Sequence, residues 1–104
     1  MKENDTVSDD YIDSYQRWQE TTTWDSVKGD KLWAIIALNS EVGELSQLVE
    51  KSLRKGTVYH DDDIMSEVGD ILWNVSNILN EYDLKLSDCM KFNIDKIERR
   101  RDGR

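Results

Sequence analysis

Residues 31–55 read KLWAIIALNSEVGELSQLVEKSLRK and contain no proline. The large apolar residues of this stretch recur at alternating intervals of three and four, a spacing that places them on one face of an α-helix. These residues are Ile35, Leu38, Val42, Leu45 and Val49. Asp30, which follows a glycine, is suited to cap the start of such a helix, and Gly56 is suited to end it. The stretch therefore predicts one long amphipathic helix over residues 31–55.

A second helix with the same periodicity is expected after a short loop. Its apolar residues again alternate by four and three, and they are Ile64, Val68, Ile71, Val75, Ile78 and Tyr82. The acidic residues 61–63 precede them and suit the positive end of a helix dipole. Two long helices joined by a short loop predict an antiparallel hairpin of the kind found in helical bundles.

Shorter helices are expected on both sides of this hairpin. Periodic apolar residues predict a first helix from about Asp9 to Trp24, with Ser8 as its N-cap, and a last helix from about Ser87. The polar residues 1–8 are expected to be frayed. We therefore predict an all-α fold with one domain over residues 1–104, a bundle of four to five helices built around the hairpin.

The chain carries a formal net charge of −8, from 22 acidic and 14 basic residues. This excess of negative charge repels phosphate backbones and argues against nucleic-acid binding, whereas it suits a concentrated acidic site for divalent cations. Cys89 and His60 are the only residues of their types, so one chain has neither a disulfide framework nor a Cys/His zinc site. No apolar run approaches the length that a bilayer requires. We therefore expect no membrane association and a cytoplasmic location.

Each of the two central helices carries nearly the same five residues, SEVGE at 40–44 and SEVGD at 66–70. Glu41 and Glu44 are three positions apart and share a helix face, as do Glu67 and Asp70. Both pairs lie beside the apolar face of their helix, so they converge if the helices pack against each other. Converging carboxylates repel one another unless a cation compensates them, and Mg²⁺, with Mn²⁺ as a substitute, prefers such oxygen ligands. These four residues are the predicted metal ligands; the alternative is that they are ordinary solvated charges.

A glycine lies beside each acidic pair, at Gly43 and Gly69, in the middle of a predicted helix. Glycine there costs about 1 kcal/mol relative to alanine. We interpret the two glycines as a sign that a neighbouring helix or a ligand approaches closely.

The order of these motifs, ExxE followed after a spacer by ExxD, resembles the signature of the all-α nucleoside triphosphate pyrophosphohydrolases, the MazG-like proteins. Residues 37–45, ALNSEVGEL, resemble the first metal-binding helix of that family, and residues 67–73, EVGDILW, resemble its second. Residues 93–100, NIDKIERR, resemble its terminal helix. The resemblance extends from about Tyr15 to Arg101. Asn74 departs from it, because many relatives have there an aromatic residue that lines the base pocket.

This resemblance implies Mg²⁺-dependent hydrolysis of a nucleoside triphosphate between its α and β phosphates, in the housecleaning of a nucleotide pool. Metal ions held by the four carboxylates would bind the phosphates, and Glu44, together with Glu41, is the predicted catalytic residue that orients the attacking water or takes its proton. The candidates for phosphate binding are Lys51, Arg54, Lys96 and Arg99. The candidates for base binding are Trp24, Gln16, Asn74 and Asn93. The other tryptophans, Trp18, Trp33 and Trp73, are expected to pack in the core.

The two central helices carry apolar residues on more than one face, for example Ile36 and Leu72 beside the main stripes. A chain of this length can hardly cover all of them, and exposed apolar area favours association. We therefore predict a homo-dimer or tetramer that completes the bundle. Two alternatives for the function remain open: a phosphoribosyl-ATP pyrophosphohydrolase, and a non-catalytic helical oligomerisation module with an acidic metal-binding seam.

Overall fold

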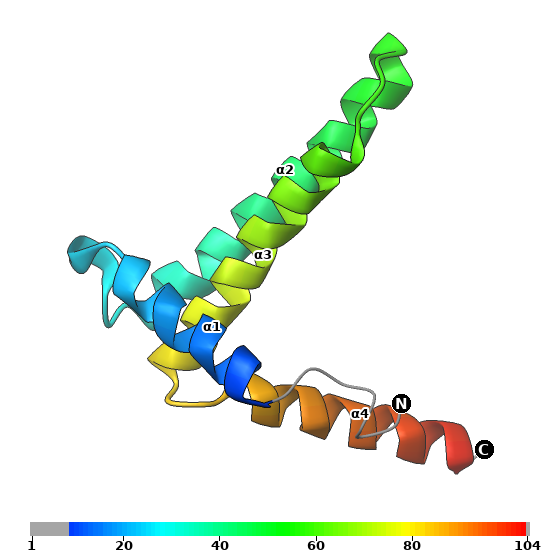
Figure 1. Cartoon of the computed structure of the whole chain (residues 1–104). Helices are drawn as coiled ribbons and strands as arrows, with labels where there is room; N and C mark the ends of the chain where they lie inside the picture. Colours follow the sequence, from blue (N-terminus) through cyan, green and yellow to red (C-terminus); the bar gives the residue numbers. More distant parts are fainter. Residues whose placement is uncertain (1–8, 104) are drawn as a thin grey trace.

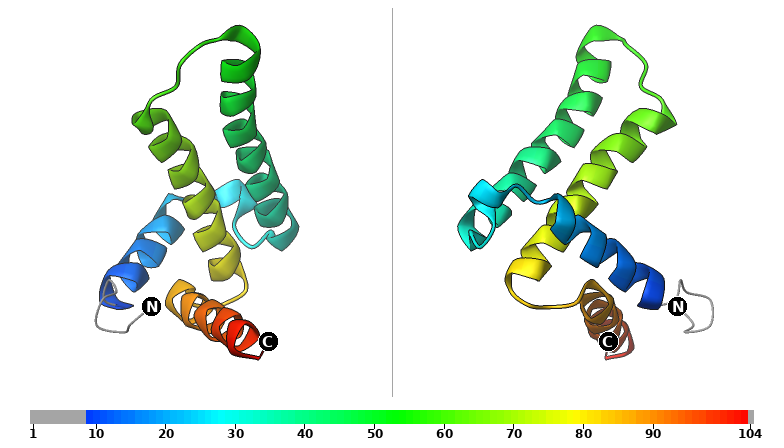
Figure 2. Two further views of the ribbon diagram at one scale, coloured as in Figure 1. Left: turned by 90° about the vertical axis from the view of Figure 1, so that its right-hand side faces the viewer. Right: turned by 60° about the vertical axis from the view of Figure 1, so that its left-hand side comes forward.

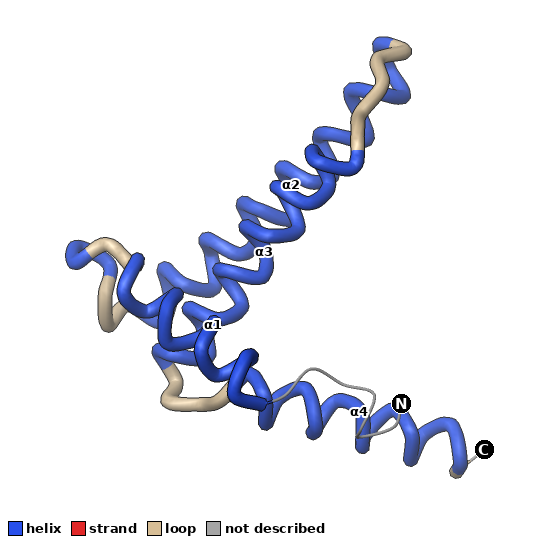
Figure 3. The backbone as a smooth tube through the Cα atoms, in the orientation of Figure 1, coloured by secondary structure: helices blue, strands red, loops and turns tan. Residues whose placement is uncertain are grey.

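A computed structural model of the chain describes residues 9–103, which fold into helices without any strand (Figure 3). In chain order the elements are α1 (Asp9–Thr22), the short 3-10 helix η2 (Asp25–Val27), α2 (Lys31–Lys55), α3 (Asp61–Glu81) and α4 (Leu86–Asp102). The prediction of an all-α fold is confirmed. The expected N-cap Ser8 and the expected fraying of residues 1–8 lie outside the described residues.

The ends of α2 follow from local hydrogen bonds that the sequence predicts. The Asp30 carboxylate accepts a hydrogen bond from the backbone N–H of Trp33 at 2.9 Å, which satisfies one of the free donors of the first turn. At the other end Gly56 has φ +70°, a left-handed conformation, and its N–H donates to the carbonyl of Ser52 at 2.9 Å. The helix therefore begins and ends at the residues where its caps stand.

Helices α2 and α3 lie side by side and antiparallel, and they form the predicted hairpin (Figure 1). Helix α1 packs across the end of α3, and α4 packs on α1 and points away from the hairpin (Figures 1 and 2). The radius of gyration is 16.4 Å, whereas a compact chain of this length has about 13 Å. One chain is therefore an open arrangement of helices.

Burial does not follow the apolar stripes that periodicity predicts. Ile35 and Val42, on the predicted core stripe of α2, remain 46% and 42% exposed, whereas Asn74 and Asn77 of α3 are only 4% and 2% exposed. Among residues 9–103 the buried hydrophobic residues are Ala34 and Leu86. The polar row of α3 faces α1 and α2, because α1 meets α3 through amide and hydroxyl side chains. The apolar faces of α2 and α3 remain partly exposed to solvent in one chain.

The tryptophans also differ from expectation. Trp18 was expected in the core but is 53% exposed in one chain. Trp33 and Trp73 are half-buried. The indole N–H of Trp73 donates to the hydroxyl of Thr22 at 2.7 Å and joins α3 to the end of α1. Trp73 therefore serves as a link between helices, whereas the Trp18 ring packs on Tyr15 at the surface, with ring centroids 5.5 Å apart.

The two mid-helix glycines have no close neighbour within the described part of the chain. A Cβ built on Gly43 or on Gly69 would have no atom within 4 Å outside its own helical backbone. The interpretation that a neighbouring helix approaches these positions is therefore wrong for a single chain, since the helices pack on other faces. None of the helices in residues 9–103 has the length and apolarity that crossing a membrane requires.

Candidate metal centre

Three carboxylates meet between α2 and α3. One oxygen atom each from Glu41, Glu67 and Asp70 can be chosen so that all three lie within 4.8 Å of one another. Glu41 comes from α2 and the other two from α3, so the hairpin itself brings them together. Glu41 and Glu67 are half-buried and Asp70 is exposed, which leaves one side of the group open to solvent.

Glu44, the fourth predicted ligand, lies beside this group. Its side chain is exposed, and it lies one helical turn from Glu41, close enough for its charge to raise the pKa of that carboxyl. Burial raises the pKa of Glu41 most, and the negative charges of Glu44, Asp70 and Glu67 raise it further. The other three predicted ligands therefore lie close enough to interact with Glu41.

The donor set fits a hard divalent cation. The Oε2 atoms of Glu41 and Glu67 are buried and have no hydrogen-bond partner among the described residues. Buried carboxylate oxygens are costly to leave without a donor or a cation. Carboxylate oxygens are the ligands that Mg²⁺ prefers, and Glu41, Glu67 and Asp70 would hold such an ion together with water or substrate oxygens.

The four basic residues expected to bind phosphate do not reach this group within one chain. Lys51 is ten residues from Glu41 along α2, which is about 15 Å. Arg54, near the same end, is paired with Glu50 at 2.7 Å. Lys96 and Arg99 belong to α4, which packs on α1 rather than on the hairpin. The structure therefore does not bring the cations and the carboxylates together inside a single copy.

The predicted base-binding residues occupy different environments. Trp24, which follows α1, is 72% exposed, and Asn93 is exposed on α4. Asn74 lies one turn beyond Asp70 on α3; its Nδ2 donates to the Asp70 carbonyl at 2.8 Å, and its buried Oδ1 has no partner. Asn74 is therefore the candidate nearest to the carboxylates along the chain.

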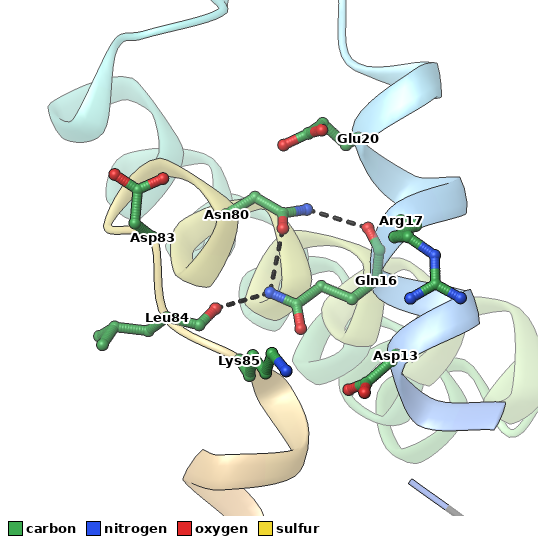
Figure 4. Close-up of a pocket in the computed structure, with 8 residues that line it drawn as sticks. All are labelled: Asp13, Gln16, Arg17, Glu20, Asn80, Asp83, Leu84 and Lys85. Atoms are coloured by element: carbon green, nitrogen blue, oxygen red, sulfur yellow. Dashed lines mark hydrogen bonds between the residues drawn. The ribbon is translucent and has the colours of Figure 1, made fainter. Parts of the chain in front are cut away.

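Gln16 has a structural role that the sequence does not show. Its Nε2 donates to the carbonyl of Leu84 at 2.7 Å and to Oδ1 of Asn80 at 3.0 Å (Figure 4). Its Oε1 accepts from the N–H of Leu86 at 2.7 Å. It lines a cavity of about 320 Å³ between α1 and the α3–α4 turn, and this cavity is separate from the carboxylate group. Gln16 therefore ties α1 to the start of α4.

Two further residues, Tyr15 and Asn77, lie near the carboxylates. Burial and the charge of Asp70 raise the pKa of Tyr15, which places the phenol of α1 near that carboxylate. Asn77 continues the helical row of Glu67, Asp70 and Asn74 at intervals of three and four, and it is almost fully buried. That spacing places Asn77 on the same face of α3 as Glu67 and Asp70.

Comparisons with known proteins agree with this geometry. Residues 30–104 match the model of the MazG nucleotide pyrophosphohydrolase domain. The chain is also similar to the Gene 37 protein of Mycobacterium phage L5, with 33% identity over 82 residues that cover 75% of this chain and 71% of the phage protein. No solved structure matches the chain. The match to the domain includes both carboxylate-bearing helices and the terminal helix.

Proposed function

Because this chain belongs to the family of MazG nucleotide pyrophosphohydrolase domains, we propose that it hydrolyses (deoxy)nucleoside triphosphates to the monophosphate and pyrophosphate. The observation that carries this proposal is the group of Glu41, Glu67 and Asp70, with two buried carboxylate oxygens that lack a partner. Such a site matches the needs of phosphate chemistry, since it concentrates cations where a polyphosphate would otherwise be repelled. The proposed role is the housecleaning of a nucleotide pool in the cytoplasm.

Glu41, Glu67 and Asp70 would hold Mg²⁺ or Mn²⁺, and Glu44 would complete the set. Bound metal supplies neutralisation of phosphate charge and a lower pKa for a coordinated water. Glu44 is exposed and lies outside the group of three carboxylates that meet between α2 and α3. We assign it, with Glu41, to orienting the attacking water and accepting its proton.

Phosphate binding is proposed to involve a second copy of the chain. Lys96 and Arg99 on α4, and Lys51 and Arg54 at the end of α2, are separated from the carboxylates within one copy. Extensive exposed apolar surface on the same helices supports association into a homo-dimer or tetramer. Trp24, Asn74 and Asn93 remain the proposed contacts of the base, and Gln16 supports them by holding α1 in place.

The test is release of pyrophosphate from a panel of canonical and modified NTPs and dNTPs, with phosphoribosyl-ATP as one member. We expect turnover with Mg²⁺ or Mn²⁺ and none in EDTA. Turnover of phosphoribosyl-ATP alone would identify the alternative pyrophosphohydrolase. Metal binding without turnover of any member would overturn the proposal and leave the oligomerisation module.

A further inference from the structure

A continuous set of hydrogen bonds connects the α3–α4 turn with the middle of α3 through α1. It begins at backbone groups, whose donor and acceptor atoms are fixed. The N–H of Leu86 donates to Oε1 of Gln16 at 2.7 Å, and Nε2 of Gln16 donates to the carbonyl of Leu84 at 2.7 Å. Since these two backbone groups cannot exchange roles, they settle which end of the Gln16 amide is oxygen and which is nitrogen.

The orientation of one amide side chain determines that of the next. Gln16 donates to Oδ1 of Asn80 at 3.0 Å, so Nδ2 of Asn80 faces Gln19 and donates to its Oε1 at 2.8 Å (Figure 4 shows the first of these bonds). Nε2 of Gln19 then donates to the hydroxyl of Thr23 at 2.8 Å. That hydroxyl donates in turn to Oδ1 of Asn77 at 3.2 Å. Gln16, Asn80 and Gln19 are therefore each oriented by a neighbour, and in the structure Asn77 accepts from the Thr23 hydroxyl.

The series ends at a donor without an acceptor. Because Oδ1 of Asn77 is held by Thr23, its Nδ2 has to point elsewhere, and this buried atom has no partner among the described residues. Asn77 is 2% exposed, and one turn earlier the buried Oδ1 of Asn74 also lacks a partner. Buried amide groups are normally satisfied, so a fixed and unsatisfied donor calls for an occupant.

The position of this donor relative to the carboxylates suggests what the occupant is. Asn77 lies two helical turns beyond Asp70 on the same row of α3, which is about 10 Å along the axis. In a nucleotide whose phosphates lie at Asp70, the sugar and then the base extend over a comparable distance. The donor lies beneath the end of α1, which passes from helix into a bend at Thr23.

We infer that Asn77 is a specificity-determining residue that donates a hydrogen bond from Nδ2 to an acceptor atom of the substrate's nucleobase, with Thr23 and Gln19 as its positioning residues. This inference rests on the proposed pyrophosphohydrolase function. A site built to donate to a base discriminates against ligands that lack the acceptor, because its own buried group is then left unpaired. In the structure the Thr23 hydroxyl holds Oδ1 of Asn77, which leaves Nδ2 for that contact.

The experiment compares a nucleoside triphosphate that the wild-type protein turns over with the abasic 1,2-dideoxyribose 5-triphosphate. Asn77→Ala is expected to lower kcat/KM at least tenfold for the base-bearing substrate, chiefly through KM, and to change it less than twofold for the abasic one. Thr23→Val removes the hydroxyl and nearly keeps the shape, and it is expected to lower kcat/KM for the base-bearing substrate alone at least fivefold. Thr23→Ser, which keeps the hydroxyl, is the matched control and should stay within twofold of wild type.

Equal losses on both substrates, or no loss on either, would overturn the inference, because they indicate that the Asn77 amide only binds a structural water. If Asn77→Ala does not fold, the comparison of Thr23→Val with Thr23→Ser is the test. Equal kcat/KM values of these two variants for the base-bearing substrate would overturn the inference. A wild-type protein that releases pyrophosphate from no triphosphate overturns the proposed function, and this inference with it. If the wild-type protein is active but the variants affect the base-bearing and the abasic substrate equally, only the inference is overturned and the proposed function stands.

Discussion

Glu41 lies close to the other carboxylates of the candidate metal centre. Its burial, and then the charges of Glu44, Asp70 and Glu67, raise its pKa in the folded chain. The folded state thus binds this proton more tightly than the unfolded state does. Between the unfolded pKa and the raised folded pKa, the free energy of unfolding therefore falls as pH rises. Above the folded pKa the ionised Glu41 destabilises the folded chain by its full amount.

Glu41→Gln removes this cost and is expected to raise the melting temperature of the metal-free protein at neutral pH. The gain should shrink as the pH is lowered toward the pKa of an ordinary glutamate, because the wild-type carboxyl is then protonated as well. Thermal denaturation followed by circular dichroism in EDTA, at a series of pH values, measures it. A gain that stays constant with pH, or a loss of stability at neutral pH, would contradict the assigned cause.

The ligand role of the α3 carboxylates leads to a second prediction. Glu67→Gln and Asp70→Asn keep the side-chain shape but remove a charged oxygen ligand, so each should lower kcat/KM by about 100-fold or more, or about 2.7 kcal/mol. Helical content should be unchanged, and the affinity for Mn²⁺ in calorimetry should fall in parallel. Asp62→Asn, in the exposed acidic turn that begins α3, is the matched control and should behave as wild type. Near wild-type activity of both α3 variants would refute the metal centre.

At the scale of the helices, the sequence predicts the elements well and their packing less well. Periodicity and caps place α2 at its observed bounds, because Asp30 and Gly56 act locally. The first helix ends at Thr22, earlier than the expected Trp24, as the hydroxyls of Thr21 and Thr22 bond back to carbonyls of the preceding turn. Convergence of the acidic pairs was predictable, since a hairpin of two such helices has few ways to pack.

What periodicity could not predict is which face of α3 is buried. Hydrophobic spacing assigns burial to the stripe that contains Val68 and Tyr82, yet both are nearly half exposed. The buried face is instead the one that carries Asn74 and Asn77, because α1 contributes Gln19 and Thr23 opposite them. Such a polar contact depends on the pairing of two helices distant in sequence, and neither helix shows it alone.

The glycines of the two acidic motifs give a prediction at the same scale. A Cβ at Gly69 would meet open space within the described chain, so Gly69→Ala should gain helix propensity without a clash. We expect it to raise the free energy of unfolding by about 0.5–1 kcal/mol, with Gly43→Ala as its counterpart on α2. Denaturant unfolding of the metal-free protein measures this. A decrease in stability for either variant would show that another chain approaches these positions.

For the whole molecule, the exposed apolar surface is the main feature to explain. Leu32 and Ile36 on α2 are 74% and 67% exposed, and Phe92 on α4 is also 67% exposed. Large apolar side chains exposed to water are unfavourable, which favours self-association. We expect sedimentation at micromolar concentration to show a dimer or tetramer, and Ile36→Glu to shift it toward the monomer. A stable 12.2 kDa wild-type monomer would refute the expectation.

The separation of Lys96 from the carboxylates within one chain allows a sharper test of the assembly. If Lys96 of one copy binds the phosphates held by another copy, Lys96→Ala should lower kcat/KM at least tenfold, or about 1.4 kcal/mol. Arg104→Ala, a change outside the described residues, is the control and should have almost no effect. The single variants alone do not show from which copy the lysine comes.

Mixing two defective variants shows which copy supplies the lysine. When Lys96→Ala and Glu67→Gln proteins are unfolded together and refolded as symmetric dimers, about one site in four combines intact carboxylates from one copy with an intact lysine from the other. The mixture should therefore recover about a quarter of wild-type activity, well above the mean of the two variants refolded separately. Lys96 acting in its own chain would give no such recovery, because every site would then keep a defect from one parent. Recovery would thus place the lysine and the carboxylates of a working site on different copies, as the direction of α4 away from the hairpin suggests (Figure 1).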